Sequence, residues 1–84
     1  MLLEIITPKT TIYKGEITLV RVPGSKGSFA MMKNHAPIIS SLEPGLIKVV
    51  EPDKNVVEFQ IAESGVVEFK KNRVVILSES IKKV

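Results

Sequence analysis

The 84-residue sequence predicts an all-β domain, either a sandwich or a barrel, and three observations support this. Apolar and polar residues alternate with a period of two in several short segments, as they do in half-buried strands. Turn-forming residues separate these segments at intervals of about ten residues, which is typical of all-β domains. No long segment has the 3.6-residue period of an amphipathic helix, and the best helical window, around Ser40 to Leu42, is interrupted by Pro44.

The first strands are indicated by runs of β-branched and aliphatic residues. Leu2 to Thr7 and Ile17 to Val22 have the composition that a pleated, half-buried surface favours. The stretch from Pro23 to Ser28 is expected to be a flexible turn between two strands. Met31 and Met32 follow it and would point to opposite faces of a strand, so that one fills the core and the other is free to meet a partner.

Two turns are expected in the middle of the chain, which reads NHAPIISSLEPGLIKV at residues 34–49. Ala36 and Pro37 lead the chain out of one strand. Pro44 presets the φ angle of a turn position, and Gly45 can take a positive φ. Apolar residues on both sides of this Pro-Gly step imply that the chain reverses direction over the core.

Further turns divide the last third of the chain into strands. Residues 52–55 suit a longer hairpin turn, and Lys71-Asn72 suits a two-residue hairpin turn because asparagine tolerates positive φ. Gly65 separates VVEFQIAE from VVEFK, and a glycine there suits a bulge or a sharp bend. The final residues, 80–84, are polar and basic and are expected to trail off the last strand.

Composition limits the kind of protein this chain can be. The length indicates one domain over residues 1–84, and the absence of cysteine excludes disulfides and cysteine-ligated zinc. No apolar run reaches the roughly 20 residues that span a bilayer, and an acid at Glu4 is unlike the start of a signal peptide. We therefore expect a cytosolic protein, or one bound to a membrane complex through partners.

His35, the only histidine, is the first candidate for chemistry. Catalysis would need a nucleophile or a carboxylate within hydrogen-bond reach, and Ser40 and Ser41 are near only in sequence. A single histidine among isolated acids is also a poor metal site. Residues 23–28 resemble a phosphate-binding loop in composition, but they lack the Walker spacing and a following helix. The residues thus favour a binding or assembly module over an enzyme.

Two alternatives stay open on the residues alone. The net charge of +3 and an isoelectric point near 9.3 are compatible with a small basic β-barrel that binds nucleic acid, although the cations are scattered and aromatic residues are few. A small hydrolase that uses His35 with a serine is the other alternative.

Residues 24–49, GSKGSFAMMKNHAPIISSLEPGLIKV, resemble the hallmark of the epsilon subunit of F-type ATP synthases. The matching residues, in order and spacing, are Gly24, Gly27, His35, Ala36, Pro37, Pro44 and Gly45. Gly65 and the runs around it resemble the Ser-Gly-Gly and two strands that follow in that family. The resemblance implies a flattened sandwich of two five-stranded sheets, with about ten short strands.

The resemblance also implies a function and a set of partners. Such a subunit is not catalytic and needs no cofactor, metal, nucleic acid or membrane insertion. It binds the gamma subunit and the c-ring, meets the alpha/beta head indirectly, and couples proton-driven rotation to ATP synthesis at the cytoplasmic face of the bacterial inner membrane. The turn expected to face the c-ring is Gly24, Ser25, Lys26, Gly27 and Ser28. The residues expected to face gamma or the ring are Met31, Met32 and His35.

Three departures from the family pattern narrow what the resemblance implies. Ser28 stands where family members commonly carry an acid, and Lys33-Asn34 replaces a Pro-Gly pair. Asn34 can still adopt the left-handed conformation that glycine would have supplied. The sequence ends at Val84 without the family's C-terminal helical hairpin, so inhibition of ATP hydrolysis by that hairpin, and ATP binding, are not expected.

Overall fold

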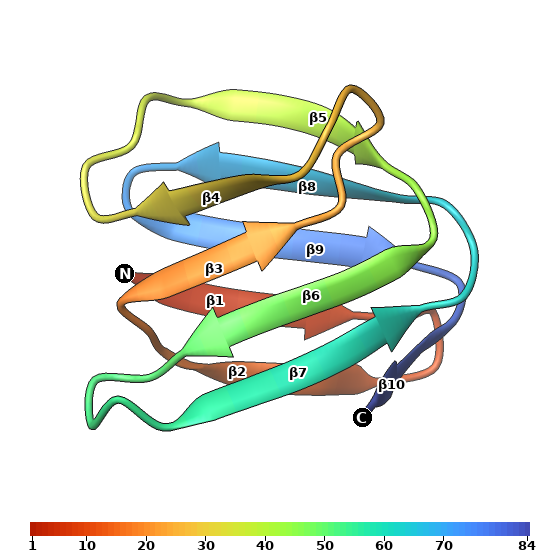
Figure 1. The fold of residues 1–84 in the computed structure, drawn as a ribbon, viewed down its shortest axis with the longest axis horizontal. Helices are drawn as coiled ribbons and strands as arrows, with labels where there is room; N and C mark the ends of the chain where they lie inside the picture. The colour runs from red at the N-terminus through yellow and green to blue at the C-terminus, as the bar shows by residue number, and fades with distance from the viewer.

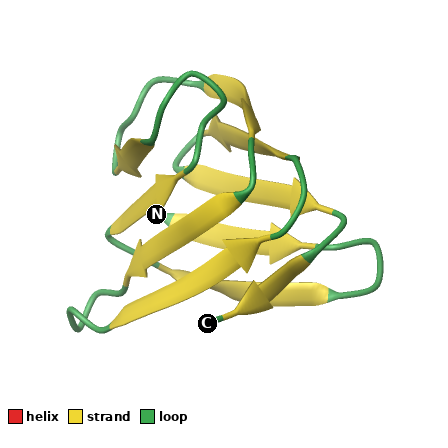
Figure 2. Ribbon diagram, turned by 45° about the vertical axis from the view of Figure 1, so that its right-hand side comes forward, coloured by secondary structure: helices red, strands yellow, loops and turns green.

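The computed structural model describes all 84 residues and consists of ten β-strands joined by turns, with no helix (Figures 1 and 2). It therefore contains no helix that could cross a membrane. The strands are β1 (Leu2–Ile6), β2 (Thr11–Glu16), β3 (Leu19–Val22), β4 (Phe29–Met32), β5 (Ile38–Leu42), β6 (Gly45–Val50), β7 (Val56–Ile61), β8 (Gly65–Lys70), β9 (Arg73–Ser78) and β10 (Ile81–Lys83).

The strands form two five-stranded sheets packed face to face, which confirms the predicted sandwich. Sheet A has the order β2-β1-β9-β8-β5, and sheet B has the order β10-β7-β6-β3-β4. All neighbours are antiparallel except β1 and β9, which are parallel. Figure 1 looks onto sheet B, and β1, β8 and β9 of sheet A lie behind it.

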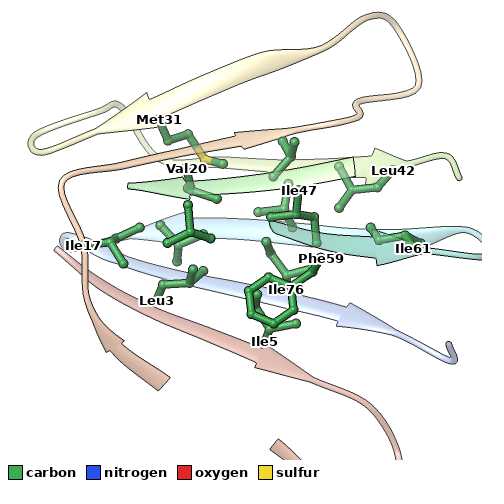
Figure 3. Close-up of a cluster of buried hydrophobic side chains, with 14 of the residues drawn as sticks. Leu3, Ile5, Ile17, Val20, Met31, Leu42, Ile47, Phe59, Ile61 and Ile76 are labelled. Carbon is green, nitrogen blue, oxygen red and sulfur yellow. The ribbon is translucent and has the colours of Figure 1, made fainter. Parts of the chain in front are cut away.

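The core between the sheets is made by inward-facing residues of both, as the period of two predicts (Figure 3). Phe59 and Ile61 of β7 and Val67 and Phe69 of β8 are buried, while their outward neighbours are more exposed. The buried side chains form a single cluster that draws on both sheets. The core members are Leu3, Ile5, Ile17, Val20, Val22, Met31, Leu42, Ile47, Val49, Phe59, Ile61, Val67, Phe69, Val74, Ile76 and Ile81.

The two predicted hairpin turns and the left-handed asparagine are confirmed. Lys71 and Asn72 have φ values of 54° and 57°, as the two central residues of a type I′ turn require. Asn34 has a φ of 67°. In the longer turn at residues 52–55, the N–H of Lys54 donates to the carbonyl oxygen of Glu51 at 2.9 Å.

Gly45 and Gly65 are needed for close packing, not for positive φ, which corrects the sequence interpretation. Gly27, with a φ of 123°, is the one glycine in the left-handed region. The chain does reverse at Gly45, but it passes from β5 of sheet A to β6 of sheet B, and a Cβ there would lie 2.9 Å from the Cβ of Pro23. Gly65 follows the bend from β7 to β8 and pairs in regular register, so it forms no bulge; a Cβ there would lie 2.6 Å from the carbonyl oxygen of Leu77.

Three strands are not predicted from the sequence: β2, β10 and β5, which covers the best helical window at Ser40 to Leu42. The expectation that residues 80–84 trail off is wrong, because β10 pairs with β7 and Ile81 is only 8% exposed. A single apolar anchor among polar residues gives no alternation, yet it is enough to add a three-residue edge strand. β2 was not predicted either, since Lys14 and Gly15 interrupt its pattern, although it pairs with β1 along most of its length.

Candidate partner interface

The residues that sequence analysis singled out gather along one side of the sandwich. β4 is an edge strand of sheet B and β5 is an edge strand of sheet A, and the two lie together at the top of Figure 1. The turn before β4 and the loop between β4 and β5 cap the two ends of this side. We call residues 24–42 the β4–β5 edge.

The turn before β4 is tied to sheet A by hydrogen bonds. The N–H of Ser25 donates to the carbonyl oxygen of Ser41 at 3.1 Å, and the hydroxyl of Ser41 donates to the Ser25 hydroxyl at 2.9 Å. The N–H of Glu43 donates to the carbonyl oxygen of Pro23 at 2.9 Å. The predicted turn between two strands is confirmed, and its hydrogen bonds join the two sheets at this end.

A cleft of about 540 Å³ lies between this turn and β5. Lys26 is its only charged lining residue, and serines and backbone supply most of the other polar groups. Gly24 is needed where the turn closes, because a Cβ there would lie 2.7 Å from the carbonyl oxygen of Gly27. The full lining is Gly24, Ser25, Lys26, Gly27, Ser28, Phe29, Ile38, Ile39, Ser40 and Ser41.

The loop between β4 and β5 is tied to the β8–β9 turn by a pair of asparagines. The N–H of Asn34 donates to Oδ1 of Asn72 at 2.7 Å, and Nδ2 of Asn72 donates to Oδ1 of Asn34 at 3.3 Å. Both residues have positive φ. The β4–β5 edge is thus fastened to sheet A at both ends.

His35 has a structural environment and no catalytic partner. Its ring packs against the ring of Phe69 with centroids 5.3 Å apart, and its Nδ1 lies 2.6 Å from the carbonyl oxygen of Ala36. The Ser40 hydroxyl donates to the carbonyl oxygen of Ser41, whose own hydroxyl is bonded to Ser25. Neither serine is paired with the imidazole, and no group of three potential metal ligands occurs in the structure.

The side chains of Met31 and Met32 point to opposite faces of β4, as predicted, but the expected contact of Met31 with a partner is wrong. Met31 is fully buried opposite Val20, so it cannot face gamma or the ring. Met32 is 58% exposed and lies on the outer face of sheet B. The expectation that one of the pair fills the core is confirmed.

The outer face of sheet A carries an apolar surface that the sequence does not predict, and it shares Ile39 with the β4–β5 edge. Ile39 is 71% exposed, Leu77 is 47% exposed and Val66 is 40% exposed. The strand register places Val66 beside Leu77 and Leu77 beside Ile6, while Ile39 lies in the adjoining row with Glu68 and Val75. We call this set the sheet A patch: Ile6, Ile39, Val66, Val75 and Leu77.

Two hollows flank the sheet A patch. One, of about 450 Å³, is bordered by Pro37, Ile38, Ile39, Glu68, Phe69 and Lys70. The other, of about 540 Å³, is bordered by Glu68, Lys70, Lys71, Arg73 and Val75. Nε of Arg73 lies 3.9 Å from Oε1 of Glu4, so part of the positive charge there is balanced.

Hydrogen bonds also join the two sheets on the side of the sandwich opposite the β4–β5 edge, and we call the residues that make them, Tyr13, Glu51 and Asn55, the clasp. The hydroxyl of Tyr13, on β2, donates to Oε2 of Glu51 at 2.6 Å, and Nδ2 of Asn55 donates to Oε1 of the same carboxylate at 2.8 Å. Burial, followed by this hydrogen bond, raises the pKa of Tyr13 to about 12. The hydrogen bonds from Tyr13 and Asn55 lower the pKa of Glu51. These groups join sheet A to the β6–β7 turn and take no part in the β4–β5 edge.

The arrangement of aromatic residues counts against the nucleic-acid alternative. Phe59 and Phe69 are buried, and the Tyr13 ring packs edge-on against Phe59 with centroids 5.6 Å apart. Base stacking needs exposed aromatic faces along a cationic groove.

The whole chain, residues 1–84, matches the family model described as ATP synthase, Delta/Epsilon chain, beta-sandwich domain. The ATP synthase epsilon chain of Chlorobium limicola is 38% identical over 79 residues, which cover 94% of this chain and 89% of the relative. The epsilon chain of Sulfurimonas denitrificans is 40% identical over 77 residues, or 92% of this chain, which spans only 58% of that relative.

Two solved structures share the fold. A chain of the Euglena gracilis mitochondrial ATP synthase, OSCP/F1/c-ring, aligns with a TM-score of 0.88 at 17% identity, over 96% of this chain and 51% of its own length. A chain of the Tetrahymena thermophila mitochondrial ATP synthase, central stalk/c-ring, aligns with a TM-score of 0.78 at 16% identity, over 96% and 64%. The protein therefore belongs to the delta/epsilon family of ATP synthases, in which the epsilon chain is a structural stalk subunit that is not itself catalytic.

Proposed function

We propose that this subunit binds gamma and the c-ring and couples proton-driven rotation to ATP synthesis in the catalytic head. The observation that carries the proposal is the β4–β5 edge, which is fastened to sheet A at both ends and adjoins the sheet A patch. Family membership supports a place in the ATP synthase complex. This surface is the part of the chain that we propose contacts its partners there.

The sheet A patch is the surface that we assign to gamma. It combines apolar side chains with Glu68, which lies between Ile39 and Val75, and it is bordered by Lys70 and Glu4. Specific protein interfaces likewise combine an apolar centre with polar groups at the rim. Ile39 is the most exposed large apolar side chain of the patch and lies on an edge strand. We therefore expect it to be an anchor that fills a pocket on gamma. His35, at the end of the same edge, would border this contact.

The turn at residues 24–28 is the surface that we assign to the c-ring. It is polar and exposed apart from Gly24, and Lys26 is the charged group of its cleft. With Ser28 in place of the acid common in the family, the turn would offer the ring a cation and hydroxyl groups. Charges in such a contact set orientation and association rate more than affinity.

Rigidity is what a subunit that transmits torque requires. The Ser25–Ser41 and Asn34–Asn72 hydrogen bonds tie both ends of the β4–β5 edge to sheet A, and the Tyr13–Glu51 bond ties the opposite side. Force applied at the turn would then pass into both sheets and not into a mobile loop. As a part of this complex, the chain would lie at the cytoplasmic face of the bacterial inner membrane and meet the alpha/beta head indirectly.

Co-purification tests this proposal. The tagged chain is expressed with gamma, mixed with c-ring in detergent, and passed over a size-exclusion column. We expect a stoichiometric complex with gamma that also retains the ring. Lys26→Glu should lose the ring but keep gamma, whereas Lys54→Glu, on the remote β6–β7 turn, should keep both. Failure of the unaltered chain to form a stoichiometric complex with gamma would refute the proposal.

A further inference from the structure

The outer face of sheet B carries an unbroken apolar row across four strands. The register places Met32 beside Leu19, Leu19 beside Val50 and Val50 beside Val56. Met32 is 58% exposed and Val56 is 49% exposed, while the two central residues are half-buried. We call these four residues the sheet B row. At about 4.8 Å between strands, the row is about 14 Å long.

Three cations lie on the same face as this row, and none of them forms an ion pair. The next outward row contains Arg21, Lys48 and Glu58 side by side, and Lys82 lies beyond it on β10. Arg21 and Lys48 stand directly opposite each other, an arrangement of like charges that destabilises a sheet. The two ion pairs of the molecule involve none of these cations. Only Lys48 has an acid directly opposite it, Glu58, whereas Arg21 and Lys82 have no acid at their paired positions.

The outer face of sheet A, by comparison, carries equal numbers of acidic and basic residues. Its outward positions include Glu4, Glu16 and Glu68 on one hand and Lys14, Lys70 and Arg73 on the other. Both ion pairs of the molecule lie on this sheet, between Met1 and Glu16 and between Arg73 and Glu4. Among the outward residues of the sheet B strands, Glu58 is the only acid against three cations.

We propose that the outer face of sheet B is a second docking surface, and that its occupant is an acidic, partly apolar segment of another protein subunit. Apolar side chains of the segment would cover the sheet B row. Successive outward residues along a strand are about 7 Å apart, so its carboxylates would meet Arg21 and Lys48 about 7 Å to one side of the row and Lys82 about 14 Å to that side. Such a contact would relieve the repulsion between Arg21 and Lys48. This surface is distinct from the sheet A patch, and it shares only Met32 with the β4–β5 edge.

Thiol labelling of the assembled ATP synthase tests the proposal, because the chain has no cysteine of its own. Val56→Cys and Met32→Cys report on the sheet B row, Ile39→Cys reports on the sheet A patch, and Lys9→Cys is an exposed control. In the complex, we expect maleimide labelling of the first two to slow by at least about tenfold relative to the isolated chain, with Lys9→Cys unchanged. Protection of Ile39→Cys alone would support the proposed function and overturn this inference.

Zero-length carbodiimide coupling of the same complex tests the chemistry of the occupant. The amines of Lys48 and Lys82 should form amide cross-links to carboxylates of one partner peptide, identified by mass spectrometry. Lys48→Arg keeps the charge but has no reactive amine, so it should abolish the Lys48 link and leave labelling protection intact. Protection without any cross-link would contradict an acidic occupant. Binding of the isolated chain to vesicles containing phosphatidylglycerol, lost in Val56→Asp, would assign the face to a membrane and also overturn the inference.

Discussion

The two outer faces of the sandwich are each formed by five strands, but they have different charge patterns. Sheet A presents equal numbers of acids and bases around an apolar patch, whereas sheet B presents three cations and one acid beside an apolar row. The inner faces show no such difference, since both contribute to one apolar core. Folding therefore places the same demand on both inner faces. We attribute the difference between the outer faces to the different partners that we propose for them.

The largest expected effect on the free energy of unfolding comes from truncating a side chain in the core that both sheets share. Phe59→Ala would lose about 3–5 kcal/mol of unfolding free energy, as truncation of a buried phenylalanine typically does. Leu46→Ala, at an outward position of sheet B that is 48% exposed, should cost no more than about 0.5 kcal/mol. Urea unfolding followed by circular dichroism measures both. Equal losses would show that the core is not where stability resides.

A backbone contact inside sheet A gives the next largest effect. In Gly65→Ala the new Cβ would lie 2.6 Å from the carbonyl oxygen of Leu77, so β8 and β9 must separate. We expect a loss of about 1–3 kcal/mol, the usual range for overpacking. Gly15→Ala is the matched control in the same sheet, because its Cβ would meet the Tyr13 hydroxyl at an ordinary 3.4 Å. If the two variants unfold at the same urea concentration, the close approach at Gly65 is not limiting.

The asparagine link between β8–β9 and the β4–β5 edge should give a smaller effect. Asn72→Ala forces alanine into a φ of 57° and removes both hydrogen bonds to Asn34, at a cost of about 1–2 kcal/mol. Asn72→Gly removes the hydrogen bonds alone and should be less destabilised. Amide hydrogen exchange at residues 33–36 should rise in both variants. Unchanged exchange there would mean that the link does not hold the edge.

The smallest effect concerns the clasp between the two sheets. The folded pKa of Glu51 lies below its ordinary value of 4.5, so its stabilisation is present above pH 4.5 and fades as pH falls through the folded pKa. The pKa of Tyr13 is raised from 10.0 to about 12. The stabilisation of the fold by the Tyr13 hydroxyl is therefore complete below pH 10 and is lost as pH rises toward 12.

Tyr13→Phe should remove the alkaline dependence and weaken the acidic one, because Asn55 still donates to Glu51. The difference in melting temperature between the unaltered chain and this variant should be largest between pH 5 and 10, and should shrink at either extreme. A difference that stays constant from pH 3 to pH 11 would show that the hydroxyl–carboxylate bond is not the source of the stabilisation.

Much of the fold can be predicted from the sequence because strand alternation and turn chemistry are local signals. The period of two places Phe59 and Phe69 in the core correctly, and Lys71-Asn72 specifies its own type I′ turn. β10 is different, since its pairing depends on one apolar anchor, Ile81, and on the neighbouring β7. Gly45 is also different, because its need for a small residue comes from Pro23, which is distant in sequence.

The candidate interface is only half predictable for a related physical reason. The residues of the β4–β5 edge follow one another in the chain, so their motif is visible as a continuous pattern. The sheet A patch combines Ile39 with Val66 and Leu77, which become neighbours only through the pairing of β5, β8 and β9. Likewise, alternation predicts that Met31 and Met32 face opposite ways, but only the tertiary fold shows that Met31 is the buried one.

The most direct test of the account compares the affinity of gamma for two matched variants. Ile39→Asp and Val56→Asp each place a charge at an exposed apolar position, one on sheet A and one on sheet B. Calorimetric titration of gamma should give a dissociation constant at least about tenfold weaker for Ile39→Asp, as expected for an interface anchor, and within about twofold of the unaltered value for Val56→Asp. Equal weakening, or weakening by Val56→Asp alone, would contradict the assignment of gamma to sheet A.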